Sequence, residues 1–392
     1  MTSDTSARRT ILVLSVCGFA STFAIRFVDP MVGEISRDLA RPTQDVALLA
    51  SAFALPYALI QPVLGPIGDA FGKERVMKAC LLVLTVSLAL STVTPDFGPL
   101  LALRIISGAA GGGIIPLVLA TIGDRVPMAE RQVAIGRFLF FNISGQLLGG
   151  TVAGLLASWT GWRLVFGLAA FLAGVAAAAV AFALPRSPKA AGRFSIAVAA
   201  DRYGRLLRMS RARALYMFVF FEGGIVFGVQ PFIAPLLEER GRGGATEAGL
   251  IIAGFALGGI AYTLAVGAML RILGLRLMLI TGGALGFVAY AVLAFGPIWP
   301  VQAGAMLLIG TSFYMLHNSF QTQTTELTSE ARASAVSLHA FSFFTGQSIG
   351  APVVGAGLLH LGLTPTMLLC GLGMVTLGLV SAAVLTRSQR AL

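Results

Sequence analysis

The chain has 392 residues, of which 56% are hydrophobic and only 11% are charged. Soluble globular proteins average about 25% charged residues, so the composition excludes an ordinary soluble domain. The net charge of +11 would also fit a nucleic-acid partner, but the positions of the basic residues exclude that interpretation, as shown below.

Long apolar stretches follow one another along the whole sequence. A bilayer core about 30 Å thick needs about 20 apolar residues of helix to cross it. The stretches are apolar all round, whereas strands of a membrane barrel alternate over about ten residues. The sequence therefore predicts an all-α membrane protein with twelve transmembrane helices. These cover residues 11–34, 46–69, 76–95, 98–122, 133–157, 162–184, 214–237, 247–270, 277–296, 299–325, 332–359 and 363–386.

The basic residues are unevenly divided between the two sides of these spans. With the N-terminus in the cytoplasm, 21 of the 28 lie on the cytoplasmic side and five on the outer side. The remaining two, Arg26 and Arg104, fall inside spans. This positive-inside bias predicts that both termini are cytoplasmic. The positive charge is therefore a feature of topology, and we expect a bacterial inner-membrane protein with no nucleic-acid partner.

The longest polar stretch, residues 186–213, separates two groups of six spans. We expect residues 1–185 and 214–392 to form an N-terminal and a C-terminal six-helix bundle, joined by a cytoplasmic linker. Within the linker, the segment from Ile196 to Met209 has the pattern of an amphipathic helix that lies on the inner membrane surface.

The two halves also resemble each other in sequence. The pentapeptide GQLLG at Gly145 returns as GQSIG at Gly346, and DPMVGEI at Asp29 is echoed by QPFIAPL at Gln230, both after 201 residues. Since six is an even number of crossings, the halves must have the same orientation in the membrane. The sequence therefore predicts two pseudo-symmetric bundles, related by an axis along the membrane normal.

The loop after the second span reads GPIGDAFGKER. It resembles the signature loop of the major facilitator superfamily. The residues that match this motif are Gly65, Asp69, Gly72, Lys73 and Arg75.

Two further segments carry the same resemblance. Arg104 lies four residues before Gly108 in the fourth span, which is similar to a motif of proton-coupled members of the superfamily. The fifth span continues GQLLGG and then WRLVF, which resembles the superfamily's antiporter motif, with Gln146 where that motif has proline. The resemblance implies the twelve-helix fold and alternating access, in which two bundles rock about a central substrate site.

Four ionisable residues lie well inside the expected spans, where a charge costs about 3 kcal/mol. Arg26 and Asp29 are three residues apart and so share a helix face. Asp29 can pair with Arg26 within its helix or with Arg104 on another helix. Either arrangement could be a static salt bridge or part of proton coupling and gating.

Glu222 has no cation near it in the sequence. An isolated carboxyl group in an apolar environment favours its protonated form, which is the property that a proton carrier needs. The residue could also be a neutral, hydrogen-bonded core glutamate or the partner of a cationic substrate. We therefore place Asp29, Arg26, Arg104 and Glu222 together as candidates for proton coupling or gating.

Polar residues at helical spacing in the tenth span form a candidate substrate surface, and His317 beside them is expected at a depth near that of Glu222. Hydrogen bonding between helices would explain the same pattern. The candidates for a substrate cavity are Tyr57, Gln61, Asn142, Gln146, Tyr314, His317, Asn318, Gln321 and Gln347.

The sequence contains no phosphate-binding loop, metal-ligand spacing or nucleophile elbow, so we expect neither an enzyme nor a cofactor. We predict a monomeric secondary transporter that exports a small amphipathic drug or metabolite in exchange for protons. The alternative is a proton-coupled symporter that imports a small organic anion or nutrient, with Arg26 and Arg104 as anion ligands. A non-transporting membrane sensor is a more remote alternative.

Overall fold

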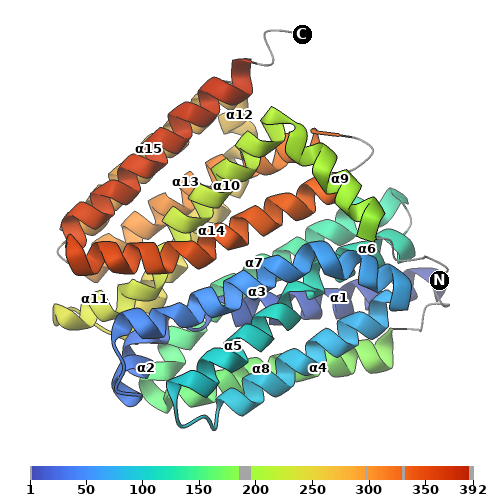
Figure 1. Cartoon of the computed structure of the whole chain (residues 1–392), viewed down its shortest axis with the longest axis horizontal. Coiled ribbons are helices and arrows are strands. Elements are labelled where there is room, and N and C mark those ends of the chain that lie inside the picture. Colours follow the sequence, from blue (N-terminus) through green and yellow to red (C-terminus); the bar gives the residue numbers. More distant parts are fainter. Residues whose placement is uncertain (1, 127, 185–195, 297, 329–331, 388–392) are drawn as a thin grey trace. The chain divides into compact units, whose positions relative to one another are not determined.

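The computed structural model describes residues 2–126, 128–184, 196–296, 298–328 and 332–387 (Figure 1). All regular secondary structure in these ranges is helical, which confirms the predicted all-α fold. The chain forms two compact units, Met1–Ser195 and Ile196–Leu392. Residues 186–195 of the expected linker lie outside the described ranges.

The first unit contains eight α-helices and one short 3-10 helix within the described residues. They are α1 (Thr2–Arg26), η1 (Asp29–Met31), α2 (Val32–Asp38), α3 (Thr43–Phe71), α4 (Lys73–Ser91), α5 (Phe97–Gly112), α6 (Ile114–Arg125), α7 (Met128–Thr160) and α8 (Trp162–Ala183).

The described part of the second unit repeats this order after an additional helix. Its elements are α9 (Ile196–Arg208), α10 (Ser210–Gly228), η2 (Gln230–Phe232), α11 (Ile233–Glu239), α12 (Ala245–Phe295), α13 (Trp299–Thr325), α14 (Arg332–His360) and α15 (Leu363–Arg387).

The first long helix of each unit ends in the same way. A 3-10 turn and a seven-residue helix follow α1 as η1 and α2, and the same pair follows α10 as η2 and α11, 201 residues later. Pro30 and Pro231 occupy the second position of the two 3-10 turns. Proline lacks the N–H that a continuing helix would use, which explains why both long helices end here. The internal repeat seen in the sequence is therefore also a repeat of backbone structure.

Two pairs of glycines mark equivalent turns in the two units. Gly72 has φ 93° and Gly274 has φ 62°, while Gly161 and Gly362 have φ 81° and 83°. These left-handed conformations are favourable only for glycine. At Gly274 the turn interrupts α12, so this one element contains the two expected spans 247–270 and 277–296.

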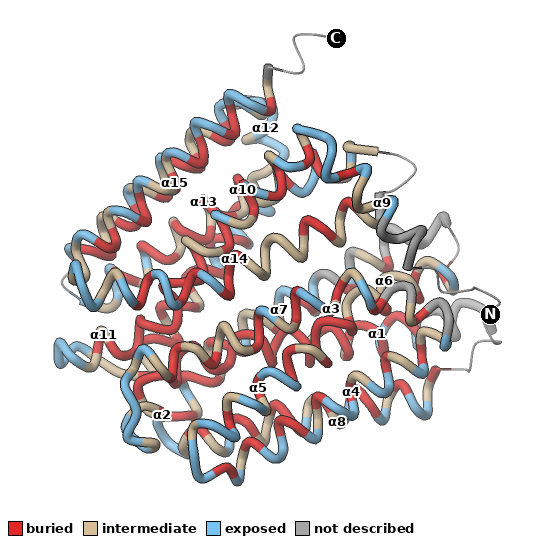
Figure 2. The backbone as a smooth tube through the Cα atoms, viewed as in Figure 1, coloured by how far each residue is buried: buried red, intermediate tan, exposed pale blue. Residues whose placement is uncertain are grey.

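The lengths and hydropathy of the helices fit a membrane protein. Eight helices in the described part of the chain are long and apolar enough to cross a bilayer, and α12 is one of them. The expected spans 76–95, 299–325 and 332–359 correspond to α4, α13 and α14, which are not among those eight. Large apolar side chains such as Phe182, Leu264 and Ile272 are 79–87% exposed. Figure 2 shows that exposed positions recur along many helices. A surface of this kind is stable against lipid.

Glycines allow close helix crossings inside each unit. A Cβ atom at Gly145 on α7 would lie 2.5 Å from the carbonyl oxygen of Phe19 on α1. In the second unit, Gly346 on α14 meets the Phe220 carbonyl of α10 in the equivalent way. The repeated GQLLG and GQSIG segments therefore mark crossings at which backbone packs directly on backbone.

The helix expected in the linker is present as α9, and its residue Leu206 packs inside the second unit. Leu206 is buried with Ala212 and Tyr216 of α10 and with Ala335 and Leu338 of α14. The structure thus assigns α9 to the second unit, where it packs on the ends of two long helices.

Candidate functional site

Arg26 and Asp29 form a buried ion pair where α1 ends. The Arg26 Nη1 atom lies 3.3 Å from Asp29 Oδ2, and their side chains are 8% and 1% exposed. The break in the helix at Pro30 places both residues inside the first unit. The second carboxylate oxygen of Asp29 has no hydrogen-bond partner among the described residues.

Arg104 on α5 is fully buried but binds backbone carbonyls instead of a carboxylate. Its Nη1 donates to the Ala24 oxygen at 3.1 Å and its Nε donates to the Leu49 oxygen at 3.3 Å. The guanidinium carbon lies 4.3 Å from the ring centre of Phe53 and 5.3 Å from that of Phe27. Within the described residues, the partner of Asp29 is therefore Arg26 and not Arg104.

Gly108, four residues after Arg104, allows α5 to come close to α3. A Cβ atom at Gly108 would collide with the backbone of Phe53, its nearest contact being the carbonyl oxygen. Because no side chain separates the two helices there, Arg104 reaches the carbonyls of both α1 and α3. This arrangement ties three helices of the first unit together.

Glu222 on α10 lies opposite His317 on α13 in the second unit. Glu222 Oε2 is 2.8 Å from His317 Nδ1, while the side chains are 0% and 17% exposed. Glu222 Oε1 has no hydrogen-bond partner in the described part of the chain. A carboxyl and an imidazole in this arrangement can hold one proton between them, on the oxygen or on the nitrogen.

Aromatic rings enclose this pair. Phe313 stacks on the His317 ring with centroids 4.8 Å apart and an interplanar angle of 22°, and Phe343 lies 4.8 Å from the same ring. Phe227 then makes edge contacts with both Phe313 and Phe343. The enclosure gives the pair a largely apolar environment, in which a flat aromatic compound could also pack.

Sequence reasoning missed His339 on α14. Its ring is 5.1 Å from the His317 ring, and its Nδ1 lies 3.1 Å from the Thr324 hydroxyl on α13. Its side chain is buried, with 3% exposed. A histidine inside an apolar span was the available signal, since such residues mark functional sites by default.

The other polar candidates on α13 either contact α12 or are exposed. Asn318 Nδ2 donates to the Tyr262 hydroxyl at 3.0 Å, and the Tyr314 ring stacks near Tyr262 with centroids 6.2 Å apart. Thr311 donates to the carbonyl of Gly258, joining α13 to α12. Gln321 is exposed.

The remaining cavity candidates lie apart from these residues in sequence. Tyr57 and Gln61 are buried on α3, and Asn142 is buried on α7, where its Oδ1 packs against Gly18 of α1. Gln146 is partly buried on α7. Gln347 is buried on α14, and its Nε2 has no hydrogen-bond partner among the residues described.

The signature loop joins α3 to α4 through Gly72. Lys73 Nζ lies 2.5 Å from Asp124 Oδ2, and Glu74 pairs with Arg125, so two ion pairs tie the start of α4 to the end of α6. Arg75 is exposed. The surroundings of the other two motif residues, Gly65 and Asp69, are outside what the structure describes.

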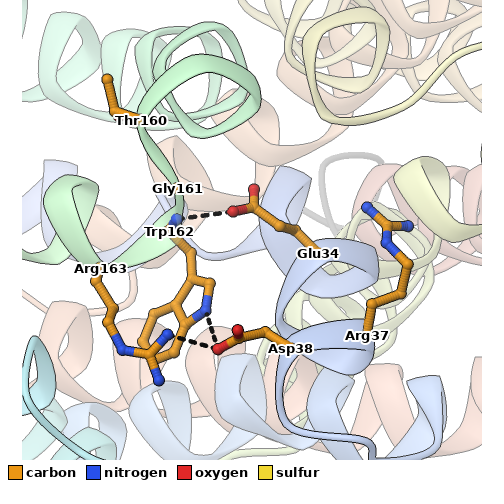
Figure 3. A pocket seen from close by; sticks show the side chains of 7 residues that line it. All are labelled: Glu34, Arg37, Asp38, Thr160, Gly161, Trp162 and Arg163. Atoms are coloured by element: carbon orange, nitrogen blue, oxygen red, sulfur yellow. Dashed lines mark hydrogen bonds and ion pairs between the residues drawn. The ribbon is translucent and has the colours of Figure 1, made fainter.

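A cavity of about 460 Å³ lies at the other end of the first unit. Figure 3 shows that Glu34 accepts a hydrogen bond from the backbone N–H of Trp162, at 2.8 Å. Asp38 accepts from the indole N–H of Trp162 at 3.0 Å and from Arg163 at 2.5 Å. Arg37 lies across Glu34 from Trp162 in this view. These bonds fasten α2 to the N-terminus of α8, so the charged residues here act as a clamp.

Known proteins share sequence with part of this chain. The family described as "Major Facilitator Superfamily" matches residues 14–351. Quinolone resistance protein NorA of Staphylococcus aureus is 30% identical over 179 residues, which are 46% of this chain and 46% of NorA. The multidrug transporter mfsC of Aspergillus fumigatus is 29% identical over 180 residues, or 46% of this chain and 35% of mfsC. The matched stretches thus span less than half of these curated relatives.

Solved structures match over nearly the whole chain. A mutant of the nucleoside transporter NupG gives a TM-score of 0.80 at 16% identity, covering 95% of this chain and 99% of NupG. The human organic anion transporter MFSD10 gives 0.69 at 17% identity, covering 96% and 99%. At these identities the likeness establishes the fold alone. The family match over residues 14–351 shows that the chain belongs to the major facilitator superfamily, a family of transporters and not of enzymes.

Proposed function

We propose that the protein is a proton-coupled exporter of small amphipathic compounds in a bacterial inner membrane, with both termini cytoplasmic, and that it works as a monomer by alternating access. The observation that carries this proposal is the buried pair of Glu222 and His317, whose Oε2 and Nδ1 atoms lie 2.8 Å apart. Proton coupling requires a group that takes up and releases a proton inside the membrane, and intramembrane carboxylates serve this role in transporters.

The surroundings of the pair support the substrate class. Aromatic rings of α13 and α14 contact His317, and a ring of α10 packs against both of them. Rings of this kind bind flat, apolar and cationic compounds. The names of NorA and mfsC describe drug resistance and multidrug transport, which supports export of such compounds.

The proposal predicts gradient-driven uptake into everted membrane vesicles. A quinolone and a fluorescent lipophilic cation serve as probes, and we expect their uptake to stop when a protonophore collapses the proton gradient. Uptake that continues unchanged would contradict proton coupling.

Glu222→Gln should abolish gradient-driven uptake while leaving substrate exchange across the membrane intact. Glu239→Gln, at an exposed position on α11, is the matched control and should behave like wild type.

Import of a small organic anion is the alternative, with Arg26 and Arg104 as its ligands. The geometry gives it less support, because Arg26 binds Asp29 and Arg104 binds two carbonyl oxygens. The direction of transport decides between the two. Accumulation of organic anions by right-side-out vesicles, without uptake of either probe by everted ones, would replace the export proposal.

A further inference from the structure

Polar side chains extend from Glu222 toward the end of the second unit where α13 finishes and α14 begins. The Glu222–His317 hydrogen bond is followed by the contact between the His317 and His339 rings, 5.1 Å apart at their centroids. His339 Nδ1 then lies 3.1 Å from Thr324 Oγ1, one residue before the end of α13. From His317 to Thr324 the helix rises about 10 Å, so the series leads from the buried carboxyl group toward the helix ends.

The hydrogen bonds of Thr324 bear on which nitrogen of His339 carries the proton. The Thr324 hydroxyl has one hydrogen and lies 2.9 Å from the Phe320 carbonyl oxygen, which can only accept. We assign this hydrogen to the Phe320 carbonyl, so that Thr324 accepts a hydrogen bond from a protonated Nδ1 of His339. In the neutral ring this leaves Nε2 without one. His339 Nε2 is buried and has no hydrogen-bond partner among the described residues, so it is a free proton acceptor beside His317.

We propose that Glu222, His317 and His339 form a proton relay, in which His339 is the terminal acceptor. This inference rests on the proposed proton coupling and identifies the route within the second unit. In the transfer, the Glu222 O–H bond breaks and a proton moves to His317 Nδ1. The His317 Nε2–H bond breaks, and that proton moves to His339 Nε2 when the two rings, 5.1 Å apart at their centroids, turn to bring these nitrogens within hydrogen-bond distance. The products are a Glu222 carboxylate, a neutral His317 and a His339 imidazolium, so net charge is unchanged.

The neighbouring groups are consistent with a relay. No cluster of three or more His, Cys, Asp or Glu side chains in the described residues could hold a metal ion. At the helix ends beyond His339, Arg211 of α10 and Glu326 both bind Gln323 of α13. In the proposed orientation this end faces the cytoplasm, where an exporter releases the protons that drive it.

The protonation state of His339 can be measured without any transport assay. The chain has three histidines, at positions 317, 339 and 360, so selective ¹⁵N-imidazole labelling gives three ring signals. Their assignment follows from His339→Gln and His360→Gln. In wild-type protein we expect a protonated Nδ1 and an unprotonated Nε2 for His339, and Thr324→Val should mix the two tautomers. A His339 ring with unprotonated Nδ1 in wild type would overturn the relay and leave the proposed function unaffected.

Transport by His339→Phe tests whether the acceptor is used. Phenylalanine retains a ring of similar size, so we expect substrate exchange to persist while gradient-driven uptake falls about a hundredfold, the lower end of the usual range for loss of a proton-transfer group. His360→Phe, at the exposed end of α14, should match wild type. If wild-type uptake responds to the proton gradient and His339→Phe responds equally, the relay is wrong and proton coupling stands. If wild-type uptake is independent of the gradient, the proposed function fails and the relay fails with it.

Discussion

Arg104 on α5 donates a hydrogen bond to the carbonyl oxygen of Ala24 on α1, at 3.1 Å. The acceptor lies two residues before Arg26, in the turn at which α1 ends. A charged donor therefore satisfies backbone that the helix leaves unpaired near its C-terminus, where positive charge is also favourable. This bond connects the arginine of the fourth span to the break in the first span without an ion pair to Asp29.

Replacement of Arg104 by lysine should destabilise the first unit. Lysine keeps the charge, but a single ammonium cannot donate in two fixed directions while packing flat between Phe27 and Phe53. We expect a decrease of about 2 kcal/mol in the free energy of unfolding, the scale of a hydrogen bond to a charged group. Thermal unfolding in detergent measures it. Arg240→Lys, at an exposed position, is the control. An equal stability of both variants would contradict the conclusion that Arg104 holds three helices together.

Addition of one methyl group at Gly346 should disturb the crossing of α10 and α14. The new Cβ would collide with the Phe220 carbonyl, and overpacking of this kind typically costs about 1–3 kcal/mol. Gly304 on α13 has open space around its Cβ position, so Gly304→Ala should stabilise the helix by about 0.5–1 kcal/mol. Opposite shifts of melting temperature are expected from the same chemical change. A stable Gly346→Ala would show that the helices can separate freely.

The two ion pairs between α4 and α6 should differ in strength. Glu74 and Arg125 have side chains 10% and 20% exposed, whereas Asp124 is 60% exposed in its pair with Lys73. Solvent screens the second pair, which is worth at most about 1 kcal/mol. Glu74→Gln should therefore lower stability more than Asp124→Asn, because it removes the charge from the less hydrated of the two ion pairs. Urea unfolding of both variants at low and high salt tests this order, and the reverse order would contradict it.

Loss of the indole N–H of Trp162 should loosen the clamp between α2 and α8. Trp162→Phe keeps a ring against Phe166 but removes the hydrogen bond to Asp38, at a cost of about 1 kcal/mol. Trp159 on α7 is 88% exposed, so Trp159→Phe is a matched control with little expected effect. Hydrogen exchange of the α2 amides provides a local measurement. Unchanged protection in Trp162→Phe would mean that the other clamp bonds suffice.

The sequence was informative wherever spacing along one helix determines position. Arg26 and Asp29 are three residues apart, and this spacing suggested that they pair. They do so in the structure, although α1 ends at Arg26 and Asp29 lies in η1. The repeat at 201 residues was likewise visible in matching segments of sequence, and it reappears as the two 3-10 turns. The expected spans in α4, α13 and α14 are not among the eight described helices that are long and apolar enough to cross a bilayer by length and composition.

Contacts between helices were beyond the sequence, because depth in the membrane does not fix rotation or neighbours. Counting residues placed His317 near the level of Glu222, but only the packing of α10 on α13 brings their atoms within 2.8 Å. Arg104 was one of two possible partners of Asp29, but its hydrogen bonds go to carbonyl oxygens, which every residue carries and no motif reveals. His339 was missed because its contacts with Thr324 and His317 depend on how α14 folds back beside α13.

The 3-10 break is built identically in both units, yet its first residue is Asp29 in one and Gln230 in the other. The same backbone turn thus carries different side chains in the two units. One copy concentrates guanidinium groups, and the other concentrates imidazole and carboxyl groups. Because the halves share their architecture, exchanging single residues between equivalent positions changes the chemistry of one half on a backbone that already accepts both side chains. Each unit can therefore serve as the structural control for substitutions made at the equivalent positions of the other.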